Sequence, residues 1–228
     1  MIVGHYAAGL VAKSVDRRIP LWLLFLAANA VDFAWAALLL LGVEKARVVP
    51  GITAADPLDL YFIPYSHGLA SSLLLFGIVV LAFGLLRRVG GLGGWRIGLV
   101  VGVTALSHWF LDLITHRPDL PLLGNLYKVG LGLWHYQVAS YVVEAAWVAF
   151  AVWLYYRGSR TAGADRRYGI AILGAVLIAT QAAFTFGPPP PSVASAAILN
   201  LLGYALLVFV AFRLERGRMA TSSAGMSP

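Results

Sequence analysis

Long apolar runs divide this chain almost from end to end, and short polar segments separate them. An α-helix rises about 1.5 Å per residue, so about 20 apolar residues can cross a hydrocarbon core that is about 30 Å thick. We identify six such runs, at residues 20–42, 67–87, 94–115, 137–157, 168–186 and 193–213. The pattern predicts an all-α integral membrane bundle of about six transmembrane helices.

The composition favours the same fold class. Charged residues make up 12% of the chain, whereas soluble domains carry about 25%. The net charge of +7 comes from short segments between or at the ends of the apolar runs, with no basic face that carries exposed aromatic residues. We therefore expect membrane lipid around the protein and no nucleic-acid partner. The absence of cysteine excludes disulfides and thiolate metal sites.

Basic residues set the predicted orientation. Along the pattern of six helices, thirteen Lys and Arg residues fall on one side of the membrane and four on the other. Because basic segments stay in the cytoplasm, we expect both termini there, in a multi-pass protein of the cell inner membrane. Residues 1–15 lack a basic start before their apolar run, so we expect no cleavable signal peptide.

The remaining segments complete the expected organisation. Residues 2–15 are apolar, but a helix of that length spans only about 20 Å, so we expect a short N-terminal helix that is partly inserted. It would lie flat at the interface or pack beside the first span. Residues 1–157 carry the motifs described below, and residues 158–213 supply two further transmembrane helices as scaffold. Residues 214–228 are expected to form a disordered cytoplasmic tail.

Ionisable side chains inside apolar spans are costly and therefore point to a function. They are Asp32 in the first span, His108 and Asp112 in the third, and Glu144 in the fourth. Counted along helices from the cytoplasmic side, His5, Asp32 and His108 each lie about 20 Å up, and Glu144 reaches the same level from outside. We expect these side chains to converge at one depth.

The third span offers the clearest pair of ligands. His108 and Asp112 are spaced i and i+4 on one helical face, and His116 continues that face by one turn. Imidazole and carboxylate groups suit Zn, with Mn or Fe as alternatives, and five or more ligands could hold two ions. Arg117, just beyond, is placed to bind an anionic group such as phosphate. The same spacing also fits a structural hydrogen-bonded pair.

Five short motifs carry a family resemblance. They are Gly4-His5 with Gly9-Leu10, Asp32, Tyr65-Ser66-His67-Gly68-Leu69, Ser107-His108-Trp109-Phe110-Leu111-Asp112 and Thr115-His116-Arg117-Pro118-Asp119. Through these motifs, the first 157 residues resemble the membrane-bound metal-dependent hydrolase family. The order of the polar residues is similar to that of the zinc-dependent phospholipase C and single-strand nuclease group.

The resemblance implies a set of site residues. The metal ligands would be His5, Asp32, His67, His108, Asp112 and His116. Glu144 would be a ligand or the general base, Arg117 would bind the substrate, and water activated by the metal would be the nucleophile. The chain departs from the family at Gly68, where Ser often stands, and at His135, which lies nine residues before Glu144. The roles of His135 and Asp119 stay open.

These features predict a membrane-embedded hydrolase that uses one or two divalent metal ions, Zn above all. Its substrate would be a phosphoester or similar bond in a lipid or lipid-linked molecule. The alternative is an ion or small-molecule transporter that uses the same intramembrane His, Asp and Glu side chains. In a third interpretation, a structural subunit of a membrane complex, the polar cluster would only pack helices. Metal bound to the purified protein would exclude this third interpretation.

Overall fold

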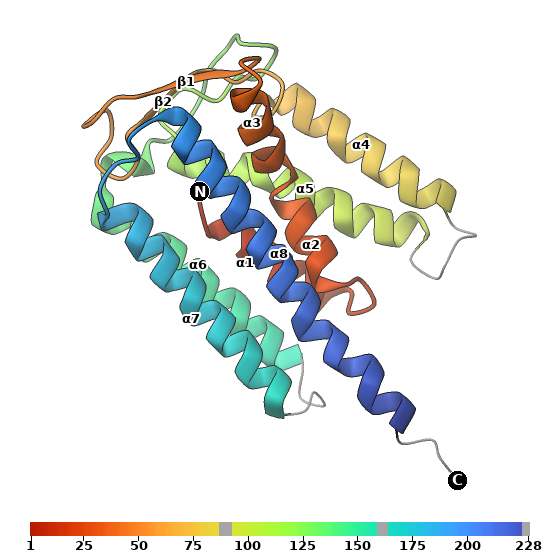
Figure 1. The fold of residues 1–228 in the computed structure, drawn as a ribbon. Helices are drawn as coiled ribbons and strands as arrows, with labels where there is room; N and C mark the ends of the chain where they lie inside the picture. Colours follow the sequence, from red (N-terminus) through yellow and green to blue (C-terminus); the bar gives the residue numbers. More distant parts are fainter. Residues whose placement is uncertain (87–92, 159–163, 225–228) are drawn as a thin grey trace.

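The structure is a computed structural model that describes residues 1–86, 93–158 and 164–224. These residues form eight α-helices, one 3-10 turn and one small hairpin (Figure 1). The helices are α1 (Gly4–Val15), α2 (Leu21–Ala28), α3 (Ala30–Leu40), α4 (Leu69–Leu85), α5 (Trp95–Thr115), α6 (Gln137–Gly158), α7 (Ala164–Phe186) and α8 (Val193–Ala224). The strands are β1 (Lys45–Val48) and β2 (Leu58–Phe62), and the 3-10 turn η2 spans Leu133–His135.

Four of the described helices are long and apolar enough to cross a membrane, namely α5, α6, residues Tyr168–Phe186 of α7 and residues Val193–Glu215 of α8. A fifth span results if α2 and α3, which meet at an angle of 51°, cross as one broken helix. Helix α4, with 17 residues, is a shorter apolar helix. Four to five spans therefore stand where the sequence predicts six, and the chain is a membrane protein by the length and composition of its helices.

The break in the first apolar run centres on Asn29. Its backbone leaves the helical conformation (φ −110°, ψ 10°), and its side-chain amide donates a hydrogen bond to the Phe25 carbonyl (2.9 Å). The bend leaves the Ala28 carbonyl facing α5, where it accepts a hydrogen bond from His108 Nδ1 (2.8 Å). The kink is stabilised because a side chain replaces the lost helical partner.

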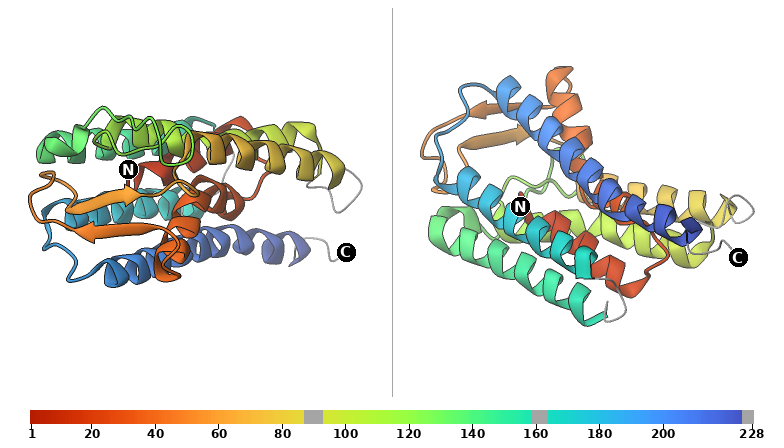
Figure 2. Two further views of the ribbon diagram at one scale, coloured as in Figure 1. Left: turned by 90° about the horizontal axis from the view of Figure 1, so that it is seen from above. Right: turned by 60° about the horizontal axis from the view of Figure 1, so that its bottom comes forward.

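Helix α1 lies at the centre of the bundle. It packs against α2, α5 and α6, and its residues Tyr6, Ala7 and Leu10 are buried. Helix α4 packs along α5, α7 packs against α6, and α8 packs against α2 and α3 (Figures 1 and 2). Residues 4–15 of the N-terminal segment thus form a helix that is packed among the longer helices.

The end of the bundle that carries the hairpin is covered by irregular chain. Strands β1 and β2 pair antiparallel, with Lys45 opposite Phe62 and Val48 opposite Leu58. The connection between α5 and η2 and the proline-rich turn after α7 lie at this end, and the C-terminus lies at the other (Figure 2). This hairpin was not predicted from the sequence.

Two expectations concern the chain ends and loops. Helix α8 continues to Ala224, so part of the segment 214–228 that we expected to be disordered is helical, and residues 225–228 lie outside the described residues. Arg87, Arg88 and Arg160, which contribute to the predicted orientation, also lie outside them.

Candidate metal centre

Asp112 is the residue around which four histidines gather. Its Oδ1 lies 3.1 Å from His5 Nε2, and its Oδ2 lies 3.0 Å from His108 Nε2. His67 Nε2 and His116 Nε2 lie 3.6 and 3.7 Å from the same Oδ2. Helix α5 supplies Asp112 and His108, α1 supplies His5, and His67 and His116 flank α4 and α5. Residues separated by more than 100 positions thus meet at one carboxylate.

Asp32 closes the other side of the cluster. It lies in the first turn of α3, directly after the bend at Asn29. Its Oδ1 is 3.5 Å from His67 Nε2 and 3.6 Å from His108 Nε2. Two groups offer ligand atoms within 4.8 Å of one another: His5, Asp32 and His108 form one, and His67, His108 and Asp112 form the other. All these side chains are buried, and they could hold a metal ion.

The second nitrogen of three histidines is fixed by an oxygen acceptor. His108 Nδ1 donates to the Ala28 carbonyl (2.8 Å), and His116 Nδ1 donates to Asp119 Oδ1 (2.9 Å). His67 Nδ1 lies 2.8 Å from Ser66 Oγ, and Ser66 gives its own proton to Glu44 Oε2 (2.6 Å). The Ser66 oxygen must therefore accept from His67. This arrangement is typical of metal-binding histidines, whose outer N–H is held by an oxygen.

These hydrogen bonds place the ring proton on Nδ1, so the unprotonated Nε2 atoms face carboxylate oxygens. A neutral imidazole that carries its proton on Nδ1 presents an unprotonated Nε2. In His67, His108 and His116 this nitrogen points toward the carboxylates of Asp32 and Asp112, which only accept. Both ring nitrogens of His5 and the Nε2 of His108 have no hydrogen-bond partner among the described residues. The Met1 ammonium donates to Asp112 Oδ1. At Asp112 Oδ2, three Nε2 acceptors instead face another acceptor, which is unfavourable, and a cation between them removes the repulsion. The donor set therefore fits a divalent metal ion.

Glu144 does not join this cluster. It is fully buried on α6, and its Oε2 accepts hydrogen bonds from the backbone N–H groups of Ile2 (3.0 Å) and Gly4 (3.2 Å). Its Oε1 accepts a hydrogen bond from Gln181 Nε2 (3.1 Å). The carboxylate thus holds the start of α1, one residue before His5. The sequence places Glu144 at the right depth, but the structure gives it to the backbone of α1 rather than to the imidazoles.

Trp147 adds a second bond between α6 and the same turn, because its Nε1 donates to the Gly4 carbonyl (3.0 Å). The amino nitrogen of Met1 reaches past this turn to Asp112 and to Thr115 Oγ1 (2.9 Å). The first turn of α1 is thus bonded to both α5 and α6.

Arg117 is occupied by carboxylates. Its guanidinium pairs with Asp59 of β2 and lies 3.3 Å from Asp119 Oδ2. Asp59 also binds Arg47 of β1 (2.7 Å). Arg117 therefore links the hairpin to the chain after α5, and Asp119 joins it to His116. Arg117 is not among the residues that line the pocket described below; it binds Asp119, which orients His116.

Three further residues complete the surroundings. His135 is exposed in η2 and belongs to neither group of possible metal ligands. Trp134, next to it, packs its ring on His116 with centroids 4.2 Å apart. Glu44 is buried and was not predicted; it also accepts hydrogen bonds from the backbone N–H groups of Tyr65 and Ser66. Its only signal in the sequence is a carboxylate just past the end of an apolar run.

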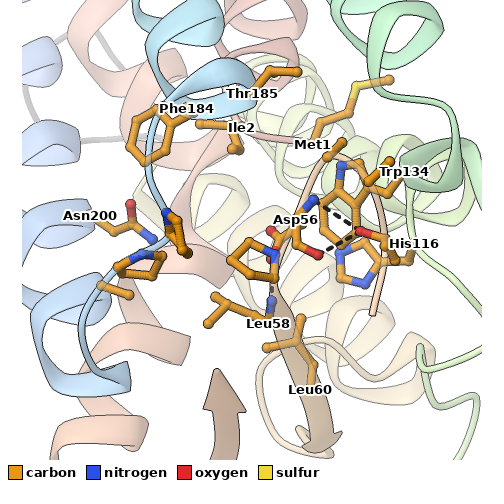
Figure 3. A pocket seen from close by; sticks show the side chains of 18 of the residues that line it. Met1, Ile2, Asp56, Leu58, Leu60, His116, Trp134, Phe184, Thr185 and Asn200 are labelled. Carbon is orange, nitrogen blue, oxygen red and sulfur yellow. Dashed lines mark hydrogen bonds between the residues drawn. The ribbon is translucent and has the colours of Figure 1, made fainter. Parts of the chain in front are cut away.

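A pocket of about 480 Å³ leads to the cluster. Asp32, His67, Asp112 and His116 line its polar part. Figure 3 shows Phe184 and Asn200 on one side of the pocket and His116 and Trp134 on the other, with Asp56 between them. Among the described residues no Lys or Arg lines this pocket. Burial raises the pKa of the Asp56 carboxyl above its usual value, although the carboxylate accepts a hydrogen bond from the Leu58 N–H (2.7 Å).

Comparison with protein-family models, with curated proteins and with solved structures finds no match for this chain.

Proposed function

We propose that this protein is a membrane-embedded, metal-dependent hydrolase that cleaves an ester bond in a membrane-derived substrate. The observation that carries the proposal is the set of three Nδ1-restrained histidines whose Nε2 atoms face Asp112. Two of them, His67 and His108, also lie beside Asp32. Structural histidines do not need this matched orientation, whereas metal ligands do. The cluster also lies at the end of a pocket, as a catalytic centre requires.

The ion would be held by His5, Asp32, His67, His108, Asp112 and His116. Zn suits this set of imidazoles and carboxylates, and Mn or Fe are the alternatives. His108 belongs to both groups of candidate ligands but has only its Nε2 free to bind, so it can serve one ion. A divalent ion supplies a Lewis acid that polarises the bond to be cleaved and acidifies water.

The other residues support this centre. Asp119 and the pair Ser66–Glu44 hold the imidazoles of His116 and His67 in place. Glu144 holds α1, and with it His5, so we propose a positioning role for it. The family resemblance implies a phosphoester substrate, which carries negative charge. Arg117 is already bound to Asp59 and Asp119. The metal would therefore neutralise the charge of the phosphoester.

The orientation follows from the distribution of basic residues. We propose that both termini lie in the cytoplasm of a cell whose inner membrane holds the protein. The hairpin, the proline-rich turn and the end of the bundle that holds the pocket would then lie on the outer side of the membrane.

Metal analysis of the purified protein tests the proposal. The wild type should hold a stoichiometric divalent ion and should hydrolyse bis(p-nitrophenyl) phosphate or a lipid ester in a reaction that EDTA stops. A protein without metal under all loading conditions would contradict the hydrolase and favour transport. A metal-loaded protein that cleaves neither probe would support the metal centre but contradict the proposed hydrolysis.

A further inference from the structure

The two helices that border the pocket make their main contacts with different neighbours. Helix α7 packs against α6, whereas α8 packs against α2 and α3. The proline-rich turn from Gly187 to Ser192 joins them at the end that carries the hairpin, and Gly169 lies against Leu214 near the other end. The right-hand view of Figure 2 shows the two helices apart next to the turn. In a membrane-spanning bundle, the space between two such helices faces lipid.

The pocket lies in this space. Helix α7 lines it with Phe184, and α8 lines it with Ala196 and Leu199. Phe184 is 44% exposed and Leu199 is 59% exposed, on helices that are apolar enough to cross a membrane. Large exposed apolar side chains are ordinary on a lipid-facing surface, so these two residues place the mouth of the pocket beside the bilayer.

The opposite end of the pocket is polar. There the carboxylates of Asp32 and Asp112 and the imidazoles of His67 and His116 line the wall. Phe184 and His116 lie on opposite sides in Figure 3. A molecule that satisfied both ends would have a polar, hydrolysable group joined to an apolar chain. The volume of about 480 Å³ suits a pocket for a drug-sized group, so most of a long chain would remain in the bilayer.

We infer that the pocket takes the polar end of a single membrane lipid directly from the bilayer, with the lipid's acyl chain passing between α7 and α8 beside Leu199. This inference names the substrate class of the proposed hydrolase and to that extent rests on the proposed function. The binding of lipid between the two helices does not depend on metal or on catalysis, because Phe184 and Leu199 belong to neither candidate metal group.

Photocross-linking in nanodiscs tests the inference. The full-length protein is placed in phosphatidylglycerol discs that contain a phosphatidylglycerol with a diazirine in its acyl chain, and cross-linked peptides are mapped by mass spectrometry. Cross-links should appear at residues 183–204. Leu199→Trp should abolish them by filling the mouth. Leu206→Trp is the matched control, because Leu206 lies two turns along α8, is 59% exposed, and does not line the pocket.

A second pair of variants separates blocking of the pocket from any effect of the substitution on folding. The chain contains no cysteine, so Leu199→Cys and Leu206→Cys each offer one thiol that a bulky maleimide can label after the protein has folded. Label at position 199 should abolish the cross-link, and label at position 206 should leave it. Equal cross-linking in both labelled proteins would overturn the inference, since only annular lipid would then contact α8.

Failure of the proposed function would look different. His108→Ala should lose metal and hydrolysis and keep the cross-link at residues 183–204. Lipid bound there in a protein that never binds metal would support the inference and contradict the hydrolase. A metal-loaded, active hydrolase whose cross-links are unchanged by label at position 199 would support the proposed function and contradict the inference.

Discussion

The imidazole rings of His5 and His108 stack face to face, with centroids 3.7 Å apart and planes at 11°. One ring comes from α1 and the other from α5, and both are buried. Two imidazolium ions would repel each other in this arrangement, so at least one of the rings must be neutral. A neutral imidazole is the form that binds a metal.

Replacing His108 by Ala should remove the metal. His108 Nε2 lies within reach of both Asp32 and Asp112, and no other described residue belongs to both candidate groups. We expect metal content, measured by elemental analysis, to fall to background and hydrolysis to fall with it. Because the change removes a polar group from a membrane span, the protein should still insert. His135→Ala, on an exposed histidine outside the cluster, is the control and should keep its metal.

Ser66→Ala should weaken metal binding without removing a ligand. The hydroxyl of Ser66 accepts from His67 Nδ1 and donates to Glu44, and so fixes the ring that presents Nε2 to the site. Loss of such an outer partner typically costs about 10- to 100-fold in metal affinity. Competition with a chelator of known affinity measures the change. Ser192→Ala, in the α7–α8 turn, removes an exposed hydroxyl and should leave the metal affinity unchanged. An unchanged metal affinity in Ser66→Ala would show that His67 is not a ligand.

Glu144→Ala should loosen α1. It removes the acceptor for the N–H groups of Ile2 and Gly4. Hydrogen bonds to charged groups contribute about 1.5–3 kcal/mol each, so we expect a clear drop in melting temperature. Metal affinity should also fall, because His5 follows directly in the sequence. Trp147→Phe removes one neutral bond to the same turn and should have a smaller effect. If Glu144→Ala abolished hydrolysis with stability and metal affinity intact, Glu144 would be a catalytic group instead.

Asp56→Asn should change how stability depends on pH. Burial raises the pKa of this carboxyl in the folded protein above its value in the unfolded chain. The folded state therefore holds the proton more strongly, and the stability that this provides is complete below the unfolded pKa and is lost as pH rises through the folded pKa. Melting temperatures of metal-free protein, measured from about pH 4 upward, should fall more in the wild type than in Asp56→Asn. Parallel curves would show that Asp56 ionises freely.

Reporter fusions should establish the topology. Because the basic residues divide thirteen to four, fusions after residue 166 and after residue 189 should report the cytoplasm and the outside respectively. Both positions on one side would contradict the proposed orientation and place the pocket mouth elsewhere.

The positions of most helices could be read from the sequence because lipid imposes long apolar runs. Four runs appear as membrane-length helices. The break at Asn29 could not be read, since one Asn within an apolar run does not show which neighbour will bind the freed carbonyl. The small hairpin is held by pairs such as Arg47 with Asp59, and such charges look like ordinary loop residues until the chain folds.

Depth in the membrane can be counted from the sequence, and it predicted which side chains of the candidate site lie at one level. The hydrogen-bond partners of those side chains could not be predicted in this way. His5, Asp32, His108 and Asp112 lie together as counting along helices suggested. The same count put Glu144 with them, but depth cannot tell whether a carboxylate meets an imidazole or a backbone N–H. The sequence assigns Arg117 to a substrate because it does not reveal that Asp59, which lies in β2, will be its neighbour.

The central position of α1 sets an order for biosynthesis. Helix α1 leaves the ribosome before every helix it packs against, and its hydrogen bonds from Ile2 to Glu144 join residues 142 positions apart. The early helices therefore lack their contacts with α6 until α6 has been synthesised. The metal centre can be completed only then, so a nascent chain that stalls before α6 would expose His5 and the polar face of α5 to lipid, where membrane quality control could recognise them.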